Sequence, residues 1–198
     1  MKRMLLVILA AGSAAVASAQ IQFGVKAGVN LASLSLSNDN SGASLSNKTD
    51  FNAGALLSIP LVSSFHLQPE AMYSSQGASA TQSGTTVKLN NAYLNVPVLL
   101  KYQHVTGLFA ETGPQVGFLL SAKATMSGQP TTDTKSNTQS TDFSWAFGVG
   151  YKIPIINLGI DARYNLGLTN VNKSSSNSNA TAKNAVFQID LFYMFKGL

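Results

Sequence analysis

Apolar residues recur at every second position along most of the chain after residue 20. In the stretch LGIDARYNLGLTNV, residues 158–171, Leu158 and Ile160 belong to the apolar phase, whereas Asp161 and Arg163 lie in the other phase. This period of two is the signature of a strand with two unlike faces. It recurs in eight segments, which cover residues 21–31, 51–61, 65–73, 94–102, 108–120, 143–151, 158–168 and 185–195. Each is about as long as a tilted membrane strand, so the pattern predicts eight such strands.

The connections between these segments alternate in length. Long polar stretches lie near residues 35–49, 77–86, 122–141 and 170–183, and short turns lie near residues 62–64, 103–106 and 153–156. Long loops at one rim and tight turns at the other, with both termini on the turn side, are typical of an outer-membrane barrel. Pro69, Pro97 and Pro114 fall inside predicted strands. Because proline lacks a ladder donor, we expect bulges or local strand ends there.

The first twenty residues, MKRMLLVILAAGSAAVASAQ, form a leader rather than part of the fold. Lys2 and Arg3 precede a short apolar run, and Ala17 and Ala19 supply the small residues that a signal peptidase reads. The run is too short and too rich in Ala and Ser to serve as an N-terminal membrane anchor. We therefore expect a cleaved signal peptide over residues 1–19, export through the general secretory pathway, and one barrel domain over residues 20–198.

Composition narrows the chemistry that is available to this chain. It has no cysteine, which excludes disulfides, thiolate metal sites and a lipid-modified cysteine near the cleavage site. The formal net charge of +5 falls to +3 once Lys2 and Arg3 are removed. A net charge this small does not indicate a nucleic-acid-binding protein. Charged residues make up 11% of the chain, where soluble domains have about 25%. No apolar run after the leader is long enough for a transmembrane helix.

Alternation alone fits two kinds of barrel, because a soluble lipocalin-like barrel also has eight alternating strands, with apolar residues inside. In that case the second phase would face water and be rich in Lys and Glu. It holds Gly, amides and occasional charges instead, as a narrow polar lumen does. The sequence thus predicts an all-β fold, an eight-stranded antiparallel up-and-down transmembrane β-barrel whose apolar phase faces lipid.

The charged residues of the predicted strands all lie in the luminal phase. They are Lys26, Glu70, Lys101, Glu111, Asp161, Arg163 and Asp190, three positive and four negative charges. Charges in a confined interior must be paired or hydrogen-bonded, so we expect a structural charge cluster. Because the seventh, eighth and first strands are adjacent in a closed barrel, Arg163 is expected to meet Asp190, and Asp190 to meet Lys26.

Aromatic residues lie near the ends of the predicted strands. They are Phe23, Tyr73, Tyr102, Phe143, Trp145, Tyr151, Tyr193 and Phe195. Such positions suit interfacial aromatic girdles, although aromatic residues also favour strands in general.

Five segments, FGVKAGVNLASLS, FHLQPEAMYSSQG, YLNVPVLLKYQ, GLFAETGPQVGFLLSAK and FGVGYKIPIINLGIDARYNLGLTNV, resemble in this order the PorT-like outer-membrane β-barrel family of Bacteroidetes. The resemblance runs from about residue 23 to residue 195. It implies a barrel of the OmpA/OmpX architecture in the outer membrane and a Bacteroidetes source. It carries no catalytic residues, and the family's namesake takes part in secretion of surface proteins.

No catalytic constellation stands out in the chain. His66 and His104 lie at short turns on the same rim without metal-ligand spacing, and no G-x-S-x-G motif is present. Carboxylate pairs, Glu70 with Glu111 or Asp161 with Asp190, could act as general acid and base. An eight-stranded barrel, however, leaves an interior only wide enough for side chains. We therefore expect no enzymatic activity, no cofactor and no metal.

Three roles remain open for such a barrel. The first is a structural or surface-interaction protein whose loops meet an extracellular or envelope partner, and the second is an accessory of envelope biogenesis or secretion. The third, a diffusion pore, is disfavoured because open channels have about 16 strands. The expected partners are outer-membrane lipid, the barrel-assembly machinery during insertion and a protein that binds the loops, but no nucleic acid.

Overall fold

The computed structural model describes residues 21–37, 45–82, 85–170 and 181–195. The expected signal peptide, residues 1–19, lies outside these ranges. The strands are β1 (Gln22–Ser37), β2 (Leu45–Val62), β3 (Phe65–Gln82), β4 (Thr85–Gln103), β5 (Leu108–Met126), β6 (Thr132–Asp133), β7 (Thr141–Lys152), β8 (Leu158–Gly167) and β9 (Thr181–Met194), with a short 3-10 helix, η2 (Lys135–Asn137). Within the described residues, no helix combines the length and the apolar character needed to cross a bilayer.

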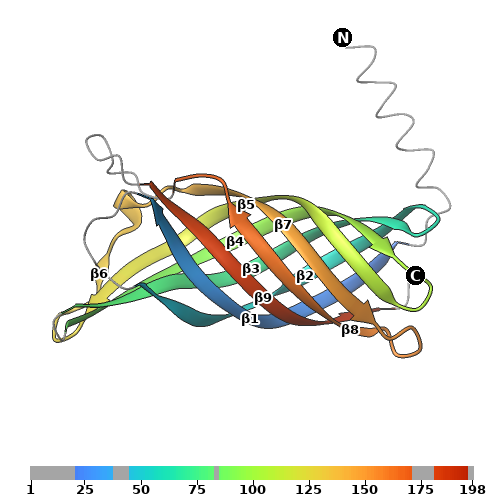
Figure 1. Ribbon diagram of the computed structural model, residues 1–198, viewed down its shortest axis with the longest axis horizontal. Helices are drawn as coiled ribbons and strands as arrows, with labels where there is room; N and C mark the ends of the chain where they lie inside the picture. Colours follow the sequence, from blue (N-terminus) through green and yellow to red (C-terminus); the bar gives the residue numbers. More distant parts are fainter. Residues whose placement is uncertain (1–20, 38–44, 83–84, 171–180, 196–198) are drawn as a thin grey trace, which may run out of the picture.

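Eight of these strands close into an antiparallel barrel. Each pairs with its neighbours in the order β4-β3-β2-β1-β9-β8-β7-β5, and pairing of β4 with β5 closes the ring. The two-residue β6 adds to β5 outside this ring. Figure 1 shows the strands tilted around the long axis, with β6 at one end and the β7–β8 turn at the other. The predicted all-β, eight-stranded antiparallel up-and-down barrel is confirmed. Closure leaves no open edge along the wall, which a strand barrel in lipid requires.

The tight turns lie at the end opposite β6. Each of these turns contains one residue with a positive φ angle. They are Ser63 between β2 and β3 (48°), Gly107 between β4 and β5 (100°) and Asn157 between β7 and β8 (55°). At the other end the strands are longer than predicted. Polar residues 77–86 were expected to form a loop, but β3 and β4 stay paired from Gly77↔Asn90 to Gln82↔Thr85. An apolar outward face is needed only within lipid, so strands that continue past it lose the alternation and keep their hydrogen bonds.

The three strand prolines do not cause bulges or strand ends. Between β2 and β3, the pairs Leu56↔Glu70 and Ile59↔Leu67 flank Pro69 with one constant offset, and the ladder lacks two pairs between them. Equivalent two-pair gaps adjoin Pro97 in the β3–β4 ladder and Pro114 in the β4–β5 ladder, again without a register shift. The expectation of bulges was wrong, because each proline removes a donor without inserting a residue. We call these the proline gaps.

The barrel is apolar on its outer surface and polar inside, which is the reverse of a soluble protein. Large apolar side chains such as Phe51, Val149 and Leu191 are more than half exposed, whereas Asn30, Gln68 and other polar side chains are buried. Strand alternation therefore places an apolar surface toward lipid and a polar core in the lumen.

Candidate functional site

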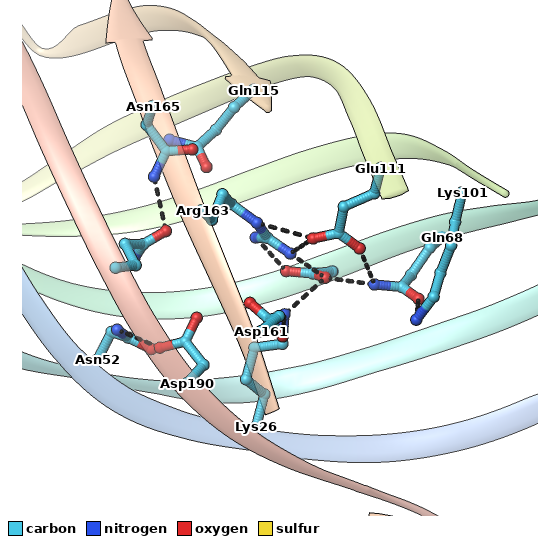
Figure 2. Close-up of polar contacts among 12 residues, drawn as sticks. Lys26, Asn52, Gln68, Lys101, Glu111, Gln115, Asp161, Arg163, Asn165 and Asp190 are labelled. Atoms are coloured by element: carbon cyan, nitrogen blue, oxygen red, sulfur yellow. Dashed lines mark hydrogen bonds and ion pairs between the residues drawn. The ribbon is translucent and has the colours of Figure 1, made fainter. Parts of the chain in front are cut away.

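The lumen holds a buried network of charged side chains, which we call the luminal ion network. It comprises Lys26 of β1, Glu70 of β3, Glu111 of β5, and Asp161 and Arg163 of β8, each at most 4% exposed. All five occupy the inward phase of their strands. Figure 2 shows Lys26 of β1, Glu111 of β5, and Asp161 and Arg163 of β8 pointing toward one another.

Arg163 forms the centre of this network. Its Nη1 and Nη2 donate to Glu70 Oε2 and Oε1, both at 2.8 Å. Its Nε and Nη2 donate to Glu111 Oε1 at 3.0 and 2.5 Å. A planar guanidinium suits such paired contacts with carboxylates. Since β8 and β3 are four strands apart in a ring of eight, the Arg163–Glu70 contact spans the full width of the lumen.

Further donors surround the two glutamates. Lys26 Nζ lies 2.8 Å from Asp161 Oδ2 and 3.5 Å from Glu70 Oε1. Gln68 Nε2 donates to Glu70 Oε1 at 2.8 Å and to Glu111 Oε2 at 3.2 Å. Each carboxylate of the network thus faces at least one cation, which offsets the cost of burying it.

Asp190 lies apart from the cations with which we expected it to pair. It is directly opposite Asp161 in the β8–β9 register, and its Oδ1 accepts from Asn52 Nδ2 at 2.8 Å. Its Oδ2 is buried without a hydrogen-bond partner among the described residues. The expected pairs of Asp190 with Arg163 and Lys26 were wrong. Strand adjacency fixes where a side chain starts, but the long Arg163 side chain reaches the opposite wall.

Lys101 of β4, also buried, has no carboxylate within ion-pair distance among the described residues. Its Nζ donates to Gln68 Oε1 at 3.2 Å and lies 3.5 Å from the centroid of the Phe109 ring and 5.0 Å from that of Phe192. These rings pack with Leu56 and Met194 into an apolar cluster. This cluster fills the lumen on the turn side of the ion network.

On the loop side, uncharged polar side chains fill the lumen. Asn52 Nδ2 and Gln188 Nε2 both donate to Asn30 Oδ1 at 2.8 Å, and Asn30 Nδ2 donates to Ser74 Oγ at 2.8 Å. Asn165 Nδ2 donates to Gln188 Oε1 at 2.6 Å. The sequence predicted amides in the lumen but not the hydrogen bonds that join them. Their signal was their position in the inward phase of long polar strands.

The side-chain layers continue toward the loop rim. Gln115 Nε2 donates to Ser144 Oγ at 3.0 Å, and Tyr93, Leu119 and Ala122 form a second buried apolar cluster. The lumen is therefore packed with an apolar layer, the ion network, an amide layer and a second apolar cluster in turn.

The eight aromatic residues of the predicted girdles all face outward, between 39% and 49% exposed. Phe23 stacks on Phe195 with ring centroids 5.5 Å apart, near the turn rim. Toward the loop rim, Trp145 Nε1 donates to Thr112 Oγ1 at 2.8 Å. Phe51 and Phe65 were not among the predicted girdle residues. The ring centroid of Phe51 lies 5.6 Å from that of Tyr73, and the ring centroid of Phe65 lies 5.2 Å from that of Tyr102.

The two histidines lie at the turn rim, each with a hydroxyl neighbour. His66 Nδ1 is 3.2 Å from Ser58 Oγ, and His104 Nδ1 is 2.9 Å from Thr106 Oγ1. Within the described part of the chain, no three His, Asp or Glu side chains gather as metal ligands would.

Comparison with known proteins gives a family and a shared fold. The family described as outer membrane protein beta-barrel domain matches residues 13–173. Neisserial surface protein A (NspA) has a similar structure, with a TM-score of 0.51 and 12% identity over 87% of this chain and 97% of that one. Ail, the attachment invasion locus protein of Yersinia pestis, gives a TM-score of 0.48 and 14% identity over 88% and 99% of the two chains. AlkL gives a TM-score of 0.36 and 17% identity over 88% and 91%. No curated protein sequence matches the chain.

Proposed function

Because this chain belongs to the outer membrane protein beta-barrel domain family, we propose that it acts at the cell surface through its loops, in a structural or partner-binding role, and not as a pore or an enzyme. The observation that carries this proposal is the packed lumen. The Arg163–Glu70 contact crosses the whole diameter, and apolar clusters lie on both sides of it. A lumen of this kind offers no path for a solute and no room for a substrate.

The loop rim is the part of the protein that is left to meet a partner. The β5–β7 connection is ordered around β6 and η2, and it is rich in Thr, Ser, Asn and Gln. Its Lys135 Nζ donates to the Leu120 carbonyl at 2.8 Å, and Thr134 N–H donates to the Ala122 carbonyl at 3.0 Å. These bonds hold the connection against the end of β5, so it can present a defined surface outside the membrane.

A second role is favoured by the resemblance of five ordered segments to the PorT-like family of Bacteroidetes. In this alternative the protein is an accessory of envelope biogenesis or protein secretion. We further propose that residues 1–19 are a signal peptide, that export follows the general secretory pathway, and that the barrel-assembly machinery inserts the chain.

A deletion strain separates the two roles. Normal secretion of surface proteins with altered adhesion or serum sensitivity supports the surface role, and loss of secretion supports the accessory role. Complementation with a barrel whose β5–β7 connection is replaced by a short Gly-Ser linker then tests whether that connection carries the activity. Stable single-channel conductance of the purified barrel in planar bilayers would contradict the packed lumen and restore the pore.

A further inference from the structure

The outward-facing apolar side chains of the strands form a band around the outer wall, which we call the apolar band. Two lysines project from the wall just beyond this band. Lys88 of β4 and Lys123 of β5 are exposed and lie on the loop side of the barrel. On β5 the apolar band ends with Phe118 and Leu120, each 46% exposed. Lys123 follows three residues later, or roughly 10 Å along a strand. Its ammonium is therefore placed at the level where lipid head groups begin.

A β-bulge turns Lys123 toward the outside. Up to Leu119, the odd-numbered residues of β5 point into the lumen. The β4–β5 register then shifts, so that Ala92 pairs with Ser121 while Tyr93 pairs with Leu119. Beyond this shift Ala122 is fully buried and Lys123 is exposed. Bulges re-aim side chains in this way, and without it Lys123 would enter the lumen.

The register places four hydrogen-bond donors together on this outer face. Lys88 is opposite Thr125, and Asn90 is opposite Lys123, as successive same-face pairs of one ladder. The two lysines are thus diagonal neighbours, whose Cα atoms are roughly 7–8 Å apart. Among the described residues, neither ammonium has an ion-pair partner or a hydrogen-bond acceptor. Two ammonium groups, an amide and a hydroxyl suit the oxygens of a phosphate group.

The β5–β7 connection adds charges of both signs beside this face. Lys135 Nζ is held against β5 by its bond to the Leu120 carbonyl. Asp133 is opposite Lys123 in the β5–β6 pairing, and its Oδ1 accepts the Lys135 backbone N–H at 2.8 Å. Three ammonium groups against one carboxylate leave the face positive.

We propose that Lys88 and Lys123, with Asn90 and Thr125, bind the phosphate group of an anionic lipid in the outer leaflet, and that the lipid's acyl chains lie on Phe118 and Leu120. This site rests on the proposed orientation, in which the loop rim faces outward. An amphiphile fits better than a soluble anion, because the polar donors directly adjoin an apolar face. Basic residues at a membrane surface favour anionic lipid by roughly a factor of five each.

The test uses the full-length barrel in zwitterionic detergent and a diphosphorylated glycolipid as the probe. Affinity is measured by native mass spectrometry during titration, for wild type and for the double variant Lys88→Gln/Lys123→Gln. A control, Lys152→Gln/Lys183→Gln, removes the same charge at the turn end of β7 and the loop end of β9, away from this face. The dephosphorylated lipid and inorganic phosphate are titrated in parallel. A heat-dependent gel shift checks that every variant is a folded barrel.

We expect the double variant to lose about thirtyfold in affinity, the control to lose less than about threefold, and Asp133→Asn to bind more tightly. Equal losses in the double variant and the control would overturn the site, since only net charge would then matter. Undiminished binding of the dephosphorylated lipid would overturn it too, and inorganic phosphate binding as tightly as the glycolipid would overturn the lipid assignment. If the wild-type protein shows no heat-dependent gel shift, it is not a folded barrel and the proposed function itself is refuted. If the gel shift is present but lipid binding does not follow these expectations, only this inference is refuted.

Discussion

Removing the Arg163 side chain should destabilise the barrel strongly. Arg163 is 1% exposed and donates four hydrogen bonds to the carboxylates of Glu70 and Glu111. Among the described residues, these carboxylates of Arg163→Ala keep only Lys26 and Gln68 as hydrogen-bond or ion-pair partners. Breaking a buried ion pair by deleting one partner costs about 3–5 kcal/mol. We expect Arg163→Ala to lower the free energy of unfolding by that amount.

The assay is equilibrium urea unfolding in lipid vesicles, followed by fluorescence of the single tryptophan, Trp145. This indole faces outward and bonds Thr112, so the substitution leaves its surroundings unchanged. Gln129→Ala, at an exposed position of the β5–β7 connection, is the control and should change the unfolding free energy by less than about 0.5 kcal/mol. Equal unfolding midpoints for the two variants would refute the reasoning.

A second comparison separates lost charge pairing from lost packing. The triple variant Arg163→Met/Glu70→Gln/Glu111→Gln removes the cation and both anions while keeping most of the volume. Replacing a whole buried ionic group is often neutral, whereas removing one member is not. The triple variant should therefore be more stable than Arg163→Ala by about 2 kcal/mol or more. If it is less stable, the arginine acts mainly through packing.

Other predictions use the same unfolding assay. Gly28→Ala would place a Cβ 2.1 Å from Asp190 Oδ1 and 2.2 Å from the Ile189 carbonyl oxygen. Such crowding should lower the free energy of unfolding by about 1–3 kcal/mol. An unchanged free energy of unfolding would show that the neighbouring strands shift to make room for the methyl group. Asp190→Asn removes the repulsion between facing carboxylates and should stabilise the barrel by about 0.2–1 kcal/mol; destabilisation would mean that the Asp190 charge is needed. Lys101→Met keeps the aromatic packing and leaves no carboxylate unpaired, so it should lower the free energy of unfolding by only about 1 kcal/mol. A loss as large as that of Arg163→Ala would contradict the assignment of Arg163, and not Lys101, as the partner of the two glutamates.

Alternation of apolar and polar residues, together with the composition of the polar phase, was sufficient to predict the barrel and its inside. The period of two fixes which side chains share a face, and low charge with many amides assigns the polar face to the lumen. These are local properties of each strand, so no knowledge of neighbouring strands was needed. The eight strands and their antiparallel, up-and-down order followed from them.

Other features depended on contacts between distant strands. The sequence predicts a loop over residues 77–86 because they lack alternation, yet pairing between β3 and β4 extends β3 to Gln82 and begins β4 at Thr85. The proline gaps kept their register because both flanking strands hold it on either side. Sequence periodicity carries no information on such support from neighbours.

Within the predicted strands, the sequence by itself determined which residues enter the lumen and which face lipid, because the pleat of a strand sets that choice residue by residue. Only the tertiary structure decided their partners. Ring closure set Glu70 across the lumen from Arg163, and the register shift in β5 turned Lys123 out of the lumen. Both outcomes depend on strand order and stagger around a closed ring, which are properties of the whole wall rather than of any one segment.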